Sequence, residues 1–183
     1  GLCDAIVERG LHKKVSFDAQ TRADGVTPEV LAAMKRAKFR TISYGIEVAS
    51  DRLMEKINKT ETVEDCVNAV RMSKEAGLDV AGTFTLGWPD QTTEERRACF
   101  DMARMLDLDV ARFNNATPYP GTALYDWVKD DPGFNPGKRW ENMNTVGALV
   151  SHPFKKPQPL SYVPSTITES QLRRVVVRYN FFY

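Results

Sequence analysis

Residues 78–95, LDVAGTFTLGWPDQTTEE, contain one complete strand–turn–helix unit. The run from Leu78 to Leu86 is rich in β-branched and aromatic residues, which is typical of a strand. Gly87-Trp88-Pro89 then interrupts the strand, and Thr92 followed by Glu95 is the capping box that opens a helix. A strand followed directly by a capped helix is the repeating unit of parallel sheets, so this stretch predicts an α/β fold.

The same alternation recurs on both sides of this unit. Strand-like runs are expected near residues 14–17, 41–46 and 110–116 as well as 79–86, and capped helical patterns lie between them. Because crossovers between parallel strands are right-handed and short, consecutive strands lie side by side. The sequence therefore predicts about four βα units, with parallel strands in sequential order and the helices outside.

The composition excludes several classes of protein. The 183 residues are 42% hydrophobic and 27% charged, enough apolar material for one sizeable core. A balance of 25 basic and 24 acidic side chains gives a net charge of +1, which does not favour nucleic acid as a partner. No apolar run reaches the roughly eighteen residues of a membrane span, and no signal peptide is recognised, so we expect a cytoplasmic protein with no membrane contact.

The three cysteines, Cys3, Cys66 and Cys99, form no C-x-x-C half-site and no disulfide framework. Cys66 and Cys99 fall on the apolar stripes of predicted helices, where cysteine behaves as a small hydrophobic residue. We expect no metal ligand among them.

The chain divides by pattern into two parts. Residues 1–127 hold the βα units, and residues 128–183 read as an irregular extension with a final helix at about 169–180, opened by the capping box of Thr168 and Gln171. Four prolines between His152 and Pro164 predict a loop. The chain starts without methionine and stops at three aromatic residues, so both ends look cut.

Polar side chains follow each of the four predicted strands. In parallel α/β folds the carboxyl ends of the strands form the site, because helix N-termini and strand-end side chains converge there. We therefore expect these residues to meet at one mouth: Arg22 after the first strand, Glu47 and Ser50 after the second, Gly87 and Gln91 after the third, and Asn114 and Tyr119 after the fourth.

Six segments in chain order carry a family resemblance: Arg22 after a strand, Gly45-Ile46-Glu47, Lys59 before Thr62, Lys74-Glu75-Ala76-Gly77, Gly87-x-Pro89, and Pro118-Tyr119-Pro120-Gly121-Thr122. Together they resemble the C-terminal half of a radical S-adenosylmethionine (SAM) domain, of the cobalamin-binding, methylthiotransferase-like and coproporphyrinogen-oxidase-like kind. The resemblance covers nearly the whole chain and implies part of a (β/α) TIM-like barrel.

The resemblance also implies an activity. Enzymes of this family bind SAM to a 4Fe-4S cluster and cleave it reductively to a 5′-deoxyadenosyl radical, and some branches use cobalamin held by a further domain. Glu47 is similar to the residue that bonds the ribose or amino group of SAM, and Arg22 would offer its guanidinium to a carboxylate. Gly87 to Thr92 would let the backbone approach the adenosine, and Asn114 to Tyr119 would edge the adenine.

The chain departs from the family pattern at several points. Val48 and Ala49 stand between Gly45-Ile46-Glu47 and Ser50, and Asp90 occupies a turn position where the family has glycine. The C-x-x-x-C-x-x-C cluster loop is absent. We therefore expect a fragment that alone binds no cluster and is inactive, and whose first strand has an exposed edge through which copies self-associate.

Two alternatives remain open from the residues. The chain is a non-catalytic α/β module that pairs through its open sheet edge, or a non-radical (β/α) lyase or hydrolase with Glu47 and Asp90 as acid and base. The substrate, small molecule or macromolecule, is unknown. Single residues also have structural readings: Arg22 can pair with Asp24, Glu47 can pair with Arg22 or Lys59, and Lys59 can be a solvated charge.

Overall fold

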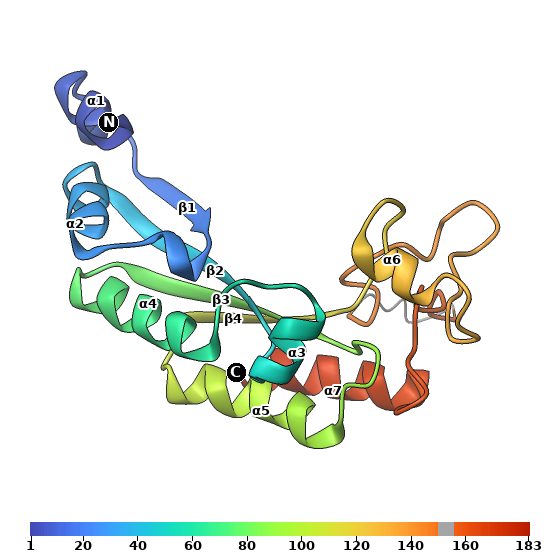
Figure 1. The fold of residues 1–183 in the computed structure, drawn as a ribbon. Coiled ribbons are helices and arrows are strands. Elements are labelled where there is room, and N and C mark those ends of the chain that lie inside the picture. The colour runs from blue at the N-terminus through green and yellow to red at the C-terminus, as the bar shows by residue number, and fades with distance from the viewer. Residues whose placement is uncertain (150–155) are drawn as a thin grey trace.

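The computed structural model describes residues 1–149 and 156–183. Its centre is a four-stranded sheet in the order β1–β2–β3–β4, in which all three neighbouring pairs are parallel (Figure 1). The predicted strand order, direction and α/β class are confirmed. The strands are β1 (Phe17–Thr21), β2 (Phe39–Glu47), β3 (Asp79–Leu86) and β4 (Val110–Asn115), and the helices are α1 (Leu2–Glu8), α2 (Pro28–Arg36), α3 (Asp51–Lys56), α4 (Val63–Glu75), α5 (Thr93–Met105), α6 (Ala123–Val128) and α7 (Glu169–Phe182).

The first strand lies later in the chain than predicted. A 3-10 turn over Leu11–Lys13 follows α1, and Val15 stays outside the sheet with half of its surface exposed. Pairing begins only at Phe17, which lies opposite Phe39 of β2. The β-branched and aromatic residues at 15–17 predict a strand that begins too early, because the start of a strand depends on its pairing partner as well as on residue propensity.

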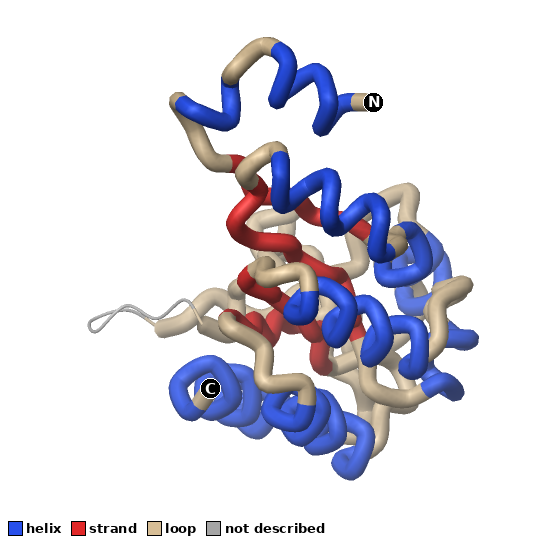
Figure 2. The backbone as a smooth tube through the Cα atoms, turned by 90° about the vertical axis from the view of Figure 1, so that its left-hand side faces the viewer, coloured by secondary structure: helices blue, strands red, loops and turns tan. Residues whose placement is uncertain are grey.

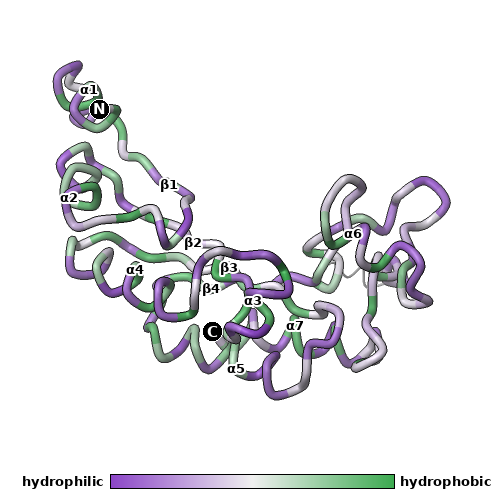
Figure 3. Tube along the Cα trace, in the orientation of Figure 1, coloured by the Kyte–Doolittle hydropathy of each residue, from purple (hydrophilic) through white to green (hydrophobic). Residues whose placement is uncertain are grey.

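Helices α2, α4 and α5 cover one side of the strands (Figure 2). Their caps form as predicted, since Thr27, Thr62 and Thr92 each accept a backbone N–H of the first turn. In Figure 3, hydrophilic and hydrophobic positions alternate along α4 and α5, as expected of helices with one buried face. Figures 1 and 2 place α2, α4 and α5 in one layer, so the opposite face of the sheet is left for other contacts.

That opposite face is small and polar. Ser43 pairs with Ala81 in the sheet, and Thr83 pairs with Arg112, all at half-buried or exposed positions that alternate with buried ones. Strand side chains alternate between faces, so the buried set, such as Ile42, points toward the helices instead. In a barrel, strand side chains alternate in the same way between the barrel interior and the outer layer.

The last helix, α7, packs beside α5 against the same core. Leu172 and Val176 are fully buried, and the Asn180 side chain bonds both the N–H and the C=O of Phe113. In the described part of the chain no further strand pairs with β4 on this side, so these two bonds satisfy a backbone pair and protect this edge of the sheet. The predicted final helix is confirmed and extends to Phe182.

Between α6 and α7 the described residues form no helix and only an isolated bridge between Phe134 and Tyr162. Part of the predicted proline loop, residues 152–155, lies outside the described residues. The division at residue 127 stays a prediction. Among the described residues, no helix is both long enough and apolar enough to cross a membrane.

Candidate functional site

A cavity of about 320 Å³ opens at the carboxyl ends of β2, β3 and β4. Three of the predicted site residues line it, Glu47, Asn114 and Tyr119. The other lining side chains are Ile57, Lys59, Thr85, Trp88, Asn115, Ala116, Thr117, Leu124 and Thr145. The cavity combines a carboxylate, an ammonium group, amides, hydroxyls and aromatic rings, which suits a polar ligand with a flat ring.

Glu47 is held in a strained position at the end of β2. Its φ is +68°, in the left-handed region that costs a residue with a side chain about 1–2 kcal/mol. A β-bulge between Gly45 and Glu47 shifts the register there, and Thr85 Oγ1 donates a 2.6 Å hydrogen bond to the Glu47 carboxylate. A Cβ at position 45 would lie 3.0 Å from Glu47 Oε1, so Gly45 gives this carboxylate its room. Strain of this kind concentrates at functional sites.

Lys59 lines the same cavity and is held from behind by a buried carboxylate. Its Nζ lies 2.6 Å from Glu61 Oε2 and also donates to the Gly45 carbonyl. Glu61 is only 1% exposed, and its second oxygen accepts a 2.6 Å hydrogen bond from the Ala23 N–H. An ammonium group has three donors, so one N–H of Lys59 remains for a ligand.

Lys59 is therefore no solvated charge, because only 15% of its side chain is exposed. Glu61 was missed by the sequence reasoning. It stands just before the Thr62 cap, where helices often carry an apolar residue, and nothing in the local pattern marks a buried carboxylate. Its partner Lys59 was the only available signal.

Arg22 is not brought to the cavity. Its guanidinium pairs with Asp24 at 2.7 Å and bonds Thr60, and its Nε lies 3.8 Å from Glu61. Half of the side chain is exposed. The structure thus shows the pairing of Arg22 with Asp24 that was the alternative reading. Among the described residues, no ion pair links Glu47 to Arg22 or to Lys59.

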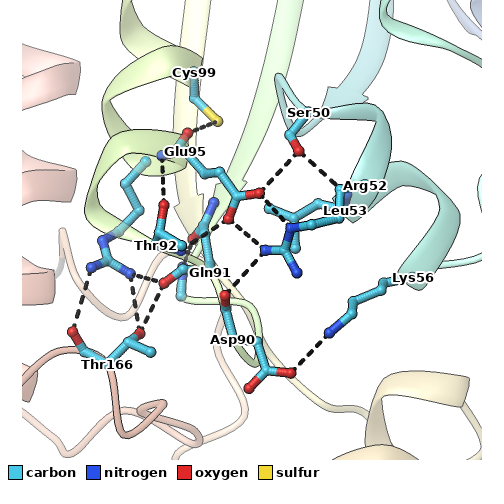
Figure 4. Close-up of polar contacts among 12 residues, drawn as sticks. Ser50, Arg52, Leu53, Lys56, Asp90, Gln91, Thr92, Glu95, Cys99 and Thr166 are labelled. Atoms are coloured by element: carbon cyan, nitrogen blue, oxygen red, sulfur yellow. Dashed lines mark hydrogen bonds and ion pairs between the residues drawn. The ribbon is translucent and has the colours of Figure 1, made fainter.

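Ser50 belongs to a separate network, drawn in Figure 4, that joins α3 to the start of α5. Ser50 Oγ donates to Glu95 at 3.0 Å, and Arg52 holds the same carboxylate with bonds of 2.9 and 2.7 Å. Burial opposes ionisation of Glu95, but hydrogen bonds from Arg52, the Thr92 N–H and Ser50 outweigh it and lower the pKa of Glu95 to about 2. This network fixes the two helices and does not line the cavity.

Gly87 and Gln91 shape the turn after β3. Gln91 is fully buried, and its side-chain oxygen accepts a 2.7 Å bond from the Gly87 N–H. Gly87 has a φ of +86°, and a Cβ there would lie 2.8 Å from Leu172 of α7. Neither residue lines the cavity. Their positions agree with a structural role in the turn.

Asp90 follows in the same turn with a φ of +57°. Its carboxylate lies 3.0 Å from Lys56 and does not line the cavity that Glu47 lines. An acid–base pair must reach the same reacting group, so this arrangement does not favour a lyase or hydrolase that uses Glu47 with Asp90.

The cysteines do not fit an iron–sulfur cluster. Burial raises the pKa of Cys66 to about 11 and that of Cys99 to about 12, so neither is a thiolate at neutral pH. Within residues 1–149 and 156–183, no three His, Cys, Asp or Glu side chains are grouped so as to hold a metal ion. A 4Fe-4S cluster needs closely spaced thiolates.

Several proteins are similar to this chain in sequence. One, named as an uncharacterized methyltransferase of Pyrococcus horikoshii, is 41% identical over 114 residues, which are 62% of this chain and 25% of that protein. An anaerobic magnesium-protoporphyrin IX monomethyl ester cyclase of Cereibacter sphaeroides is 30% identical over 130 residues, 70% of this chain and 21% of the cyclase. The chain thus spans a quarter or less of the length of these relatives.

Solved structures show the same fold. The radical S-adenosylmethionine methyltransferase TsrM of Kitasatospora setae, whose structure holds cobalamin and a 4Fe-4S cluster, superposes with a TM-score of 0.66 at 22% identity, over 73% of this chain and 27% of that one. Coproporphyrinogen III oxidase of Escherichia coli superposes with a TM-score of 0.57 at 18% identity, over 63% of this chain and 27% of the oxidase. The pattern of the radical SAM superfamily matches residues 3–103, more than half of the chain. By that match and by its parallel βα architecture, this chain belongs to the radical SAM superfamily.

Proposed function

We propose that this chain is the part of a radical SAM enzyme that holds the SAM molecule, and that the cavity at Glu47 and Lys59 is where SAM binds. The observation that carries the proposal is the strained Glu47 carboxylate facing the same cavity as the anchored Lys59 ammonium. Family membership and the methyltransferase-like relatives support it.

The charges of the cavity match the amino-acid end of SAM. The Glu47 carboxylate would accept hydrogen bonds from the ammonium group of SAM or from its ribose hydroxyls. The free N–H of Lys59 would donate to the carboxylate of SAM. Lys59 takes the role first expected of Arg22, because Lys59 lines the cavity and Arg22 does not. Asn114 and Tyr119 line the same cavity and would contact the edge of the adenine. SAM, when bound, supplies the transferable methyl or 5′-deoxyadenosyl group.

SAM binding by the chain tests the proposal through equilibrium dialysis with radiolabelled SAM. Glu47→Gln and Lys59→Met should each raise the dissociation constant about tenfold or more, since each removes a charge-assisted hydrogen bond. Lys56→Met is the matched control, because Lys56 pairs with Asp90 outside the cavity and should leave binding unchanged. If all three variants bind SAM as tightly as the wild-type chain, SAM does not bind in this cavity.

We further propose that the cluster thiolates, and cobalamin if the enzyme uses it, come from parts of the enzyme outside these residues, so that the chain alone is inactive. The raised pKa values of Cys66 and Cys99 support this. Anaerobic incubation with iron, sulfide and dithionite, followed by electron paramagnetic resonance, should show no stoichiometric cluster. A thiol-ligated cluster on the 183-residue chain would refute the proposal.

The outer edge of β1 supports a proposal on assembly. Within the described residues β1 pairs only with β2, and an unpaired strand edge is a template for another chain. We expect copies of the chain to self-associate through this edge. Sedimentation velocity over a concentration series should show a dimer, and a mass of one chain at all concentrations would contradict it.

A further inference from the structure

A second cleft lies at the opposite end of β2 from the cavity, at the amino ends of β1 and β2. It has a volume of about 450 Å³, in the size range of ligand pockets. Its lining includes Lys13, Lys14, Lys35, Lys38, Arg40 and the ring of Phe39, and no carboxylate lines it. The protein as a whole carries a net charge of only +1, so the positive charge of this cleft is not apparent from the net charge.

The register of the sheet creates the cleft from two separate segments. Lys13 and Lys14 come just before β1, and Lys38 and Arg40 flank Phe39 at the start of β2. Parallel pairing places Phe17 opposite Phe39, with ring centroids 5.3 Å apart. Basic side chains from both segments thus line the cleft together with the half-buried ring of Phe39, which packs against Phe17.

The cations of the cleft are not neutralised by the protein. Within the described part of the chain, no ion pair involves Lys13, Lys14, Lys38 or Arg40, and Lys35 donates to the carbonyl of Gly77. In the sheet, the carboxylates nearest to these residues are Asp18 and Asp79, which both pair with Thr41. Neither of them lines the cleft. Unpaired charges at this density attract an anion with several negative groups.

We propose that this cleft binds single-stranded nucleic acid, with phosphodiester groups on the lysines and a base stacked on Phe39. A basic groove with an accessible aromatic ring is the arrangement that binds single strands, because every base offers a face for stacking. The proposal revises the expectation drawn from net charge and does not depend on SAM binding. Phe39 and Glu47 are eight residues apart along β2, roughly 26 Å at about 3.3 Å per residue, so the two sites are separate.

Fluorescence anisotropy with a labelled single-stranded RNA of mixed sequence tests the proposal on the 183-residue chain. Five phosphate contacts predict that the logarithm of the binding constant falls with the logarithm of salt concentration with a slope of about −3.5, from roughly 0.7 per contact. The double variant Lys14→Ala with Arg40→Ala should bring the slope to about −2 and weaken binding at least tenfold at low salt. The same double change at exposed Lys129 and Lys138, outside the cleft, should change neither quantity.

Further binding experiments distinguish nucleic acid from other polyanions. Phe39→Leu should weaken RNA binding several-fold while leaving the salt slope unchanged, because it removes stacking but no charge. A DNA strand of the same sequence should compete if the cleft reads phosphates and bases alone, and tighter RNA binding assigns a contact to the ribose 2′-hydroxyl. Failure of the Lys14 and Arg40 variant to alter binding overturns the proposal. The proposal is also overturned if a polyglutamate peptide binds as tightly as RNA and its affinity is unchanged by Phe39→Leu, because the cleft would then bind an acidic protein.

Discussion

Two polar clusters lie at the carboxyl end of the sheet, and they differ in how fully the protein satisfies them. In the network of Ser50, Arg52 and Glu95, the carboxylate accepts bonds from Ser50 and Arg52 on one side and from the Thr92 N–H on the other, and it does not line the cavity at Glu47. In the cluster of Glu47 and Lys59, the backbone is strained, a donor is left over and both side chains face a cavity. From this difference we infer that the first network holds the fold and that the second binds a ligand.

The anchor of Lys59 should give the largest effect. Glu61→Leu leaves the Lys59 charge without its buried partner and the Ala23 N–H without its acceptor, so we expect a loss of about 3 kcal/mol in the free energy of unfolding. Urea denaturation measures it. Adding Lys59→Met to Glu61→Leu removes both charges and should restore the part of the loss that comes from the unpaired Lys59, while the Ala23 N–H still lacks its acceptor. A double variant as unstable as Glu61→Leu would show that the ion pair is not the cause.

The network of Glu95 should show itself in acid. The pKa of Glu95 is lowered from its ordinary value of 4.5 to about 2, so its contribution is complete above about pH 5 and disappears as the pH falls toward 2. We expect this contribution to be on the order of 1–2 kcal/mol, since Arg52 is half exposed. Unfolding free energies of wild type and Glu95→Gln should converge as the pH falls from 5 to 2. A constant difference over that range would contradict the assignment.

The strain at Glu47 should give the smallest change in stability. Glu47→Gly and Glu47→Ala both lose the bond from Thr85, but only glycine adopts a φ of +68° without cost. The glycine variant should therefore be about 1 kcal/mol more stable than the alanine variant by thermal unfolding. If alanine is the more stable of the two, Glu47 is not strained and the comparison loses its basis.

The fold could be predicted from local signals, whereas the site could be predicted only in part. Threonine caps and the alternation of strands and helices are properties of short segments, and β3 was predicted at its observed bounds. Glu47 could be predicted to reach the mouth because the ends of parallel strands converge. The anchor Glu61 could not, because its burial depends on the backbone of Ala23, which is distant in the sequence, and the local pattern beside Lys59 marks no buried carboxylate.

Register explains the remaining differences. The basic cleft could not be predicted because it exists only when Phe17 is paired with Phe39, and the first strand was placed too early by a few residues. Gln91 and Ser50 were expected at the ligand, yet the turn after β3 and the N-terminus of α3 use their polar atoms internally. Strand ends indicate where a site lies, but they do not indicate which polar side chains there form hydrogen bonds within the protein and are not available to a ligand.

We infer that the Glu47 cluster serves a ligand and that the Glu95 network serves the fold. Measuring the SAM dissociation constant and the unfolding free energy on Glu47→Gly and Glu95→Gln tests it most directly. We predict that Glu47→Gly weakens SAM binding about tenfold or more with an unfolding free energy within about 1 kcal/mol of wild type, whereas Glu95→Gln is destabilised at neutral pH and binds SAM normally. Wild-type SAM binding by Glu47→Gly, or parallel loss of binding and stability in both variants, would contradict the account.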